Sequence, residues 1–288
     1  MAGLQGIGDG ESSSDTCRSM PRQREPRLTD AEEAARLSEH GSRCPPRVIP
    51  RPASTTRFRG TTTPTPADTN EKSVFIPPAF RIDDRETLYA FVERYSFATL
   101  VSVHDHVPFA THVPLLFDRV AGVLVGHLAK GNPQCESFLS GAESLAIFAG
   151  PHAYISPSWY ATAPAVPTWN YAAVHVYGVP RLLSPDRTRA VVDLTVATYE
   201  HSRPTPWPNA LPEDFRRRLL AGVVGFEMPL ARVEGKFKLG QNRPEADQVG
   251  MLDGLRGDGV EAERLAEFIR WYRGLGPSAE PRAAADSR

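Results

Sequence analysis

Apolar residues recur at two different spacings along the chain, and the first clear helical spacing follows Asp83. Asp83 is a suitable N-cap, and Glu86, three residues later, completes a capping box. Four apolar residues then lie three or four positions apart and so share one helix face: Leu88, Phe91, Val92 and Tyr95. The pattern predicts a helix over about 84–95.

Three β-like runs follow, at 97–103, 108–117 and 123–129, separated by short turns. Short turns between such runs are typical of an antiparallel meander. Further β runs are predicted at 144–148, 169–183 and 223–239, and residues 150–171 are predicted as a stiff aromatic loop region. Helices are predicted at 185–200, 212–220, 244–255 and 261–273. About six strands with late helices favour an α+β domain with a mainly β core, as a closed or half-open antiparallel barrel.

The composition changes near residue 73. Residues 1–72 hold one aromatic residue, eight prolines and sixteen Ser or Thr, with eleven basic and ten acidic side chains. Such a segment cannot bury enough apolar surface to offset its ordering entropy. We therefore expect a disordered tail over 1–72, one folded domain over 73–275, and a disordered C-terminus over 276–288. A mis-assigned start at Val74 and a real interaction segment are both open explanations of the tail.

Charge and cysteine content exclude several classes of protein. Residues 73–288 carry 22 basic and 24 acidic side chains, so they lack the basic excess expected of a direct DNA binder. Only Cys135 lies in the folded part, which argues against a disulfide framework and for a reducing, cytoplasmic location. No secretory signal or membrane-spanning run is recognisable. His104 and His106 lack a nearby carboxylate cluster, so no metal site is predicted.

Two neighbouring segments carry polar residues that could contact a ligand, and the first of them suits a phosphate. In the run Gly-His-Leu-Ala-Lys-Gly-Asn-Pro-Gln at 126–134, a strand ends and His127, Lys130 and Asn132 converge at a glycine-containing turn. An exposed turn with a solvated lysine is the alternative. On the preceding strand Thr111 and His112 point to opposite faces, so one of them faces inward or toward a ligand. A core threonine beside a surface histidine is the alternative.

Two later segments suit an aromatic ligand and a second anion contact. Residues 150–171 combine Trp and Tyr side chains, such as Tyr154 and Trp169, with a few polar groups, such as Ser156. Together they can form a wall for a planar heteroaromatic ring. Packing across a dimer interface is the alternative. In the run at 234–243, Lys238 and Gln241 add donors, unless this stretch is a solvated edge strand.

The motifs together resemble the PaiB-like family of FMN-binding negative transcriptional regulators. The resemblance covers about 74–275 and rests on the stretches at 75–80, 96–103, 108–116, 126–134, 150–160, 166–171 and 234–243. It implies an antiparallel split β-barrel that binds flavin mononucleotide (FMN) in a homodimer. It also implies flavin contacts from ten residues: Thr111, His112, His127, Lys130, Asn132, Tyr154, Ser156, Trp169, Lys238 and Gln241. Lys130 stands where relatives are expected to have Arg, so the charge is kept but a bidentate fork is lost.

Three functions remain open at this point. The first is a transcriptional regulator or sensor that responds to FMN or redox state. The second is an FMN-dependent oxidoreductase acting on a small molecule, and the third is a haem-binding split barrel. No catalytic residue is identifiable, and no helix-turn-helix is recognisable, so direct DNA binding is not expected.

Overall fold

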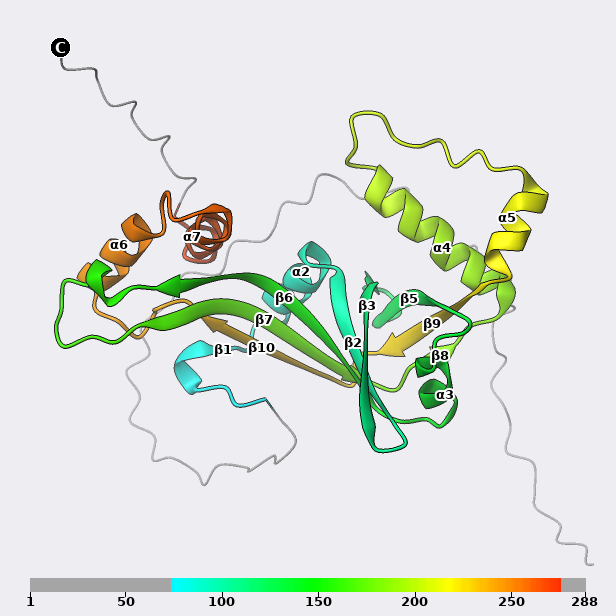
Figure 1. Cartoon of the computed structure of the whole chain (residues 1–288), viewed down its shortest axis with the longest axis horizontal. Coiled ribbons are helices and arrows are strands. Elements are labelled where there is room, and N and C mark those ends of the chain that lie inside the picture. The colour runs from blue at the N-terminus through cyan, green and yellow to red at the C-terminus, as the bar shows by residue number, and fades with distance from the viewer. Residues whose placement is uncertain (1–73, 276–288) are drawn as a thin grey trace, which may run out of the picture.

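The computed structural model describes residues 74–275, which form two antiparallel sheets around one core (Figure 1). The larger sheet has the order β1-β10-β7-β6-β2-β3. Its strands are β1 (Arg81–Ile82), β10 (Arg232–Lys238), β7 (Thr168–Gly178), β6 (Ser144–Ile155), β2 (Phe97–His104) and β3 (Val107–Pro114). The smaller sheet has the order β4-β5-β9-β8, with β4 (Leu116–Asp118), β5 (Val123–Ala129), β9 (Val223–Pro229) and β8 (Arg181–Leu182). The predicted tails at 1–72 and 276–288 lie outside the described residues.

Three predicted β runs each contain two strands, because the chain passes from one sheet to the other within the run. Residues 108–117 divide at Leu115, whose N–H donates to the carbonyl O of Ser96 at 2.8 Å. Residues 169–183 divide after Gly178, and residues 223–239 divide after Pro229. A Cβ on Gly178 would lie 2.1 Å from the carbonyl O of Pro229, so only glycine permits this close approach. The alternation of apolar and polar residues continues where the chain leaves one sheet and enters the other. For this reason the sequence pattern predicted one strand where the structure has two.

The helices mostly follow the predicted ranges: α2 (Arg85–Arg94), α4 (Pro185–Glu200), α5 (Glu213–Leu220), α6 (Glu245–Gly254) and α7 (Val260–Tyr272). The predicted cap of α2 is wrong by one residue. Asp84 is the N-cap, because its carboxylate accepts from the Thr87 N–H at 2.9 Å and the Thr87 hydroxyl at 2.6 Å. A short helix, α3 (Gln134–Leu139), was not predicted, and single 3₁₀ turns lie at Pro78–Phe80 (η1) and Pro157–Trp159 (η2).

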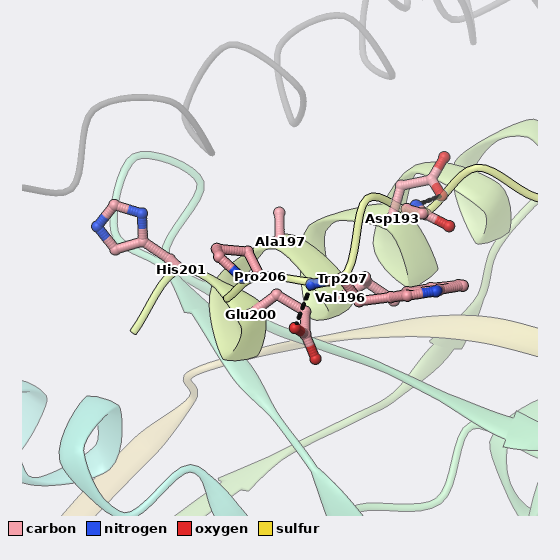
Figure 2. A pocket seen from close by; sticks show the side chains of 8 residues that line it. Asp193, Val196, Ala197, Glu200, His201, Pro206 and Trp207 are labelled. Carbon is pink, nitrogen blue, oxygen red and sulfur yellow. Dashed lines mark hydrogen bonds between the residues drawn. The ribbon is translucent and has the colours of Figure 1, made fainter. Parts of the chain in front are cut away.

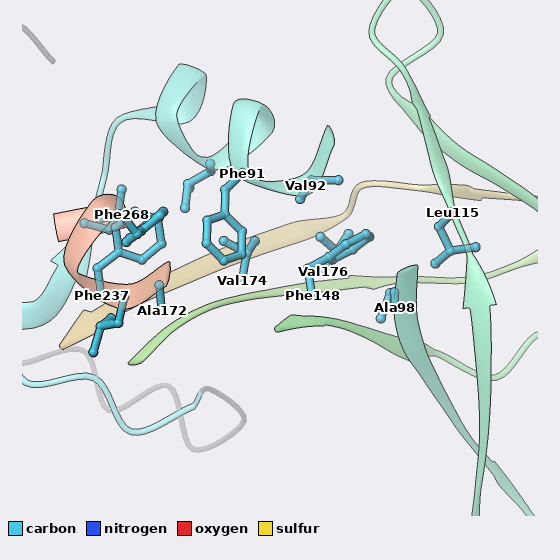
Figure 3. Packing of buried hydrophobic residues seen from close by; sticks show 14 of the residues in the cluster. Phe91, Val92, Ala98, Leu115, Phe148, Ala172, Val174, Val176, Phe237 and Phe268 are labelled. Atoms are coloured by element: carbon cyan, nitrogen blue, oxygen red, sulfur yellow. The ribbon is translucent and has the colours of Figure 1, made fainter. Parts of the chain in front are cut away.

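One face of the larger sheet is buried against α2 and α7, which lie on the same side of the sheet (Figure 1). Phe91 of α2, Phe268 of α7 and Phe237 of β10 meet over this face, with ring centroids 5.1–5.8 Å apart (Figure 3). The same cluster continues through Phe148 to residues of the smaller sheet such as Phe226. The two sheets therefore share one hydrophobic core, as the halves of a split barrel do, and the predicted α+β class is confirmed.

The β6–β7 hairpin extends well beyond the rest of the larger sheet (Figure 1). The prediction of a loop from residue 150 is wrong for 150–155, because these residues continue β6 after a bulge between Ala149 and His152. Gly150 permits this: a Cβ there would lie 2.7 Å from the ring of Phe91. The loop proper covers residues 156–167, here called the tip loop.

Candidate functional site

The second face of the larger sheet, here called the outer face, carries Thr99, Ile147 and His175. Residues of this face alternate with buried ones along β2, β6 and β7 and are half-buried or exposed. Antiparallel pairing places one row of side chains across the strands: His112, Thr99, Ile147, His175 and Glu234. This row brings together residues that are far apart in the sequence.

His112 lies on the outer face, whereas Thr111 lies on the core side, as strand alternation predicted. The Nδ1 atom of His112 is 3.0 Å from the hydroxyl of Thr99, and the ring of Phe97 stacks on the imidazole at 6.4 Å. Phe97 itself is 67% exposed. The Thr99 hydroxyl and the Phe97 ring thus hold the orientation of an exposed imidazole. Thr99 was not among the predicted site residues, because only the pairing of β2 with β3 reveals it.

The turn after β5 is fixed to β2 and β3 by two amide side chains. The Asn132 amide donates to the Thr111 hydroxyl at 3.0 Å and accepts from the Gln134 N–H at 2.9 Å. The Gln134 side chain is fully buried and donates to the carbonyl O of Leu100 at 2.9 Å. Lys130 is exposed at the start of this turn, and its backbone N–H donates to Gly222 at 3.0 Å. The structure therefore ties the turn that carries Lys130 to Thr111 of β3 through Asn132.

His127 lies on a different face of β5 from the core residues that flank it. Strand alternation places Gly126 and Leu128 toward the core, and places His127 on the side of Val125, which packs on Val191 of α4. Burial lowers the pKa of the His127 imidazole below its ordinary value. Among the described residues its Nδ1 atom has no hydrogen-bond partner. Within residues 74–275, no hydrogen bond joins His127 to the other predicted site residues.

The second predicted group lies near the end of the β6–β7 hairpin. Tyr154 and Trp169 pair across the hairpin, with ring centroids 6.1 Å apart at 75°, and they are 45% and 55% exposed. Lys238 donates to the Thr168 hydroxyl and to the carbonyl O of Trp169, the latter at 2.6 Å. Burial, followed by the charge of Lys236, lowers the pKa of the Lys238 ammonium. The outer face thus presents an exposed aromatic surface beside a cation.

Two other predicted residues bond locally to backbone groups. The Ser156 hydroxyl caps η2 by accepting from the Ser158 N–H at 3.2 Å. The Gln241 side chain accepts from the Leu239 N–H at 2.7 Å and donates to the Phe237 carbonyl at 2.6 Å, which closes the end of β10. The Ser156 side chain thus satisfies the backbone just after β6, and the Gln241 side chain satisfies the backbone at the end of β10.

The two groups lie apart within one chain. β2 pairs with β6 at Thr99 and Ile147, and Tyr154 follows Ile147 by seven residues along β6. At the rise of a β-strand this separation is roughly 20 Å. The predicted site residues therefore form two groups, one beside β2 and β3 and one at the hairpin end, with His127 outside both.

Two charged or titratable residues of the outer face, His175 and Glu234, were not among the predicted site residues. His175 is half-buried, and its Nδ1 atom has no partner among the described residues. Burial is the main cause that lowers its pKa. Its neighbour in the row, Glu234, pairs with Arg232, whose guanidinium lies 3.4 Å from the ring centroid of Tyr177. Cross-strand register, which a sequence does not state, brings these groups together.

A hollow of about 320 Å³ lies elsewhere, between α4 and the loop that follows it (Figure 2). It is lined by Asp193, Val196, Ala197, Glu200, His201, Pro206, Trp207 and Asn209. Its two carboxylates already have partners: Glu200 accepts from the Trp207 N–H at 2.7 Å, and Asp193 accepts from Arg216 at 3.1 Å. The hollow contains none of the predicted site residues and is not taken as the functional site.

In 74–275 no group of three or more His, Cys, Asp or Glu side chains is arranged to hold a metal ion. Over the same residues, no helix combines the length and apolar character needed to cross a bilayer.

Comparison with known proteins gives the family. The model of the family described as "Putative FMN-binding domain" matches residues 74–232, more than half of the chain. The chain belongs to this FMN-binding family. The match spans β2, β3, the turn at 130–134 and the β6–β7 hairpin. FMN is the cofactor of the family, so the predicted cofactor and the predicted PaiB-like resemblance are both confirmed.

Two relatives and one solved structure are similar to this chain. The chain is 36% identical over 201 residues to the "Protease synthase and sporulation protein PAI 2" of Bacillus subtilis, covering 68% of this chain and 96% of that protein. It is 30% identical over 201 residues to an uncharacterized protein of Emericella nidulans, covering 58% and 80%. A solved FAD and heme binding protein from Mycobacterium smegmatis is similar at 16% identity and a TM-score of 0.45, covering 72% and 92%.

Proposed function

We propose that this protein binds FMN at two equal sites between the copies of a homodimer, and that the bound flavin is the sensing group of a regulator. The observation that carries the proposal is that the candidate residues form two groups that lie apart on one chain. We take each group as half of a flavin site, with His112 and Lys130 in one half and Tyr154 and Trp169 in the other.

The chemistry of the two halves fits FMN. Lys130 offers an exposed ammonium for the phosphate, at a turn whose shape is held by Asn132 and Gln134. Tyr154 and Trp169 offer an aromatic surface for the isoalloxazine ring, and Lys238 adds a cation beside it. When bound, FMN supplies the redox chemistry, while the residues of the chain bind and orient it.

The separation of the halves supports a homodimer. Within one chain they lie roughly 20 Å apart along β6. In a two-fold dimer the same pair of surfaces meets twice, so the hairpin end of each copy reaches the β2–β3 half of the other. Two equal sites result, and Trp169, which is 55% exposed in the single chain, becomes covered.

A regulatory output without direct DNA reading is favoured by two observations. The Bacillus subtilis relative, of which the chain spans nearly the whole length, is named a sporulation protein. Helices α4 and α5 are separated by residues 201–212, whereas a helix-turn-helix has a turn of about three or four residues. We expect residues 74–288 to give no sequence-selective gel shift with duplex DNA at about 150 mM salt. A shift that survives competitor DNA would contradict this part of the proposal.

A second candidate, an FMN-dependent oxidoreductase, is favoured by the pair Thr99 and His112. The hydroxyl engages Nδ1, which leaves Nε2 of an exposed imidazole available to exchange a proton beside the cofactor. Steady-state oxidation of a reduced nicotinamide by the flavin-loaded protein distinguishes the two. Turnover that is lost in His112→Gln with FMN still bound would favour the enzyme.

The experiment that tests the proposal is purification followed by absorption spectroscopy, FMN titration and sedimentation. We expect the two visible bands of oxidised flavin, one FMN per chain and a dimer. A strong Soret band would instead indicate haem, and a flavin-loaded monomer would refute the shared site. We propose a cytoplasmic location from the cysteine content, and detecting the protein in separated fractions of broken cells tests it.

A further inference from the structure

The tip loop, residues 156–167, rests on α6, and its first contact is that of Trp159 with two helix glycines. A Cβ on Gly254 would lie 2.3 Å from the Trp159 ring, and a Cβ on Gly250 would lie 2.1 Å from the Trp159 carbonyl O. The glycines are four residues apart and so lie on the same side of α6. Any larger side chain at either position would displace Trp159.

A buried carboxylate on the same helix side makes the second contact. Asp247 is fully buried, and its two oxygens accept from the Thr162 N–H at 2.9 Å and the Thr162 hydroxyl at 2.7 Å. The hydrogen bond from the Thr162 hydroxyl is the largest cause that lowers the pKa of the Asp247 carboxyl. Asp247 precedes Gly250 by three residues, so the carboxylate and the glycine surface face the loop together.

The third contact is made by Arg243, which precedes α6 by two residues. Its guanidinium lies 4.4 Å from the ring centroid of Tyr160 in the tip loop. Three residues of the loop, Trp159, Tyr160 and Thr162, are thus held by one segment, 243–254. That segment is far from the loop in sequence, so the contact is tertiary.

The composition of α6 breaks two local rules at this contact. Glycine within a helix is unfavourable, and a buried carboxylate is costly unless it is hydrogen-bonded. Both occur where the helix meets the tip loop, and an apolar helix face would pack without either cost. Local departures of this kind are expected where a function requires a defined geometry.

We propose that α6 is a support that positions the flavin-facing residues of the hairpin, and that Asp247 is a positioning residue for FMN binding. The tip loop connects Ile155 to Thr168, the strand residues next to Tyr154 and Trp169, so α6 anchors the end of the hairpin that carries these two rings. The inference rests on the proposed function, because it takes these two residues as part of the flavin site.

The test compares Thr162→Val with Thr162→Ser in the full-length protein. Valine has the size of threonine but no hydroxyl, whereas serine keeps the hydroxyl. Thr162 is exposed, so both side chains fit at this position, and in both variants the backbone N–H of residue 162 still donates to Asp247. We expect Thr162→Val to raise amide hydrogen exchange in 156–167 several-fold and to weaken FMN binding by about tenfold. Thr162→Ser is expected to stay within about twofold of the parent in both measurements.

Asp247→Asn and the exposed Asp253→Asn on the same helix give a second comparison, with the visible circular dichroism of bound flavin as a spectroscopic signature. We expect Asp247→Asn to change that spectrum and Asp253→Asn to leave it unchanged. Unchanged exchange in Thr162→Val and Asp247→Asn would overturn the support. Faster exchange with unaltered FMN binding would overturn its role in positioning. If the parent binds no FMN, the proposed function fails, and the exchange measurement still decides whether α6 holds the loop.

Discussion

Replacing Lys130 by alanine is expected to weaken FMN binding without loosening the turn that carries this residue. Lys130 is exposed, and the turn is held by its own backbone bond to Gly222 and by the side chains of Asn132 and Gln134. Removing a charge-assisted phosphate contact costs about 1.5–3 kcal/mol, which corresponds to roughly 10- to 150-fold in affinity. The loss should shrink at high ionic strength, because the exposed charge is then screened.

The assay is FMN fluorescence quenching at low and high salt, with a melting curve of each variant. Lys130→Arg keeps the charge and should retain most of the affinity. Arg85→Ala removes one exposed positive charge from α2 and controls for net charge. If Lys130→Ala binds FMN like the parent, or if Arg85→Ala loses as much, the phosphate does not lie at this turn.

Three further outcomes are expected. Trp169→Ala should weaken the dimer by about 2 kcal/mol, roughly thirtyfold in the dissociation constant measured by sedimentation. Trp207 is a similarly exposed tryptophan at the α4 hollow, and Trp207→Ala should leave the dimer unchanged. Equal effects of the two substitutions would count against the hairpin as an interface. Burial lowers the pKa of His127 and His175 below the ordinary value of 6.5, so the unfolded chain takes up protons at higher pH than the folded chain. The free energy of unfolding in urea should therefore fall as the pH drops from about 7.5 to about 5.5, and His127→Gln should flatten this dependence; an unchanged slope would contradict the assignment. Deleting residues 1–72 should leave FMN affinity and dimer size unchanged in the same assays, and loss of either would show that the domain boundary is wrong.

Much of the fold was predictable because it depends on local patterns. The helix spacing at Leu88 and Phe91 required a buried face, and the structure places both residues in the core. Short turns between β runs predicted antiparallel pairing, and every strand pair in the two sheets is antiparallel. The helix α3 was missed because it spans six residues and begins beside Pro133 in a segment whose composition is that of a turn.

The candidate site was predictable only in its residue types. Lys130, Tyr154 and Trp169 stood out because cations at a glycine-containing turn and exposed aromatic residues suit a phosphate and a flat ring. The sequence gives no reason to connect Thr99 with His112, since the register of β2 on β3 makes that pair. It also gave no warning that His127 faces α4, because two faces of a strand become distinct only when their packing partners are known.

The sequence by itself therefore determined the α+β class, most element boundaries and the FMN-binding family, since periodicity, caps and motifs are properties of neighbouring residues. The tertiary structure alone decided where the chain changes sheets, which side chains share the outer face, and how α6 holds the tip loop. Those features depend on contacts between residues far apart in the chain. Contacts such as that of Asp247 with Thr162 leave no periodic pattern in the sequence, because each one joins two individual residues that are far apart in the chain.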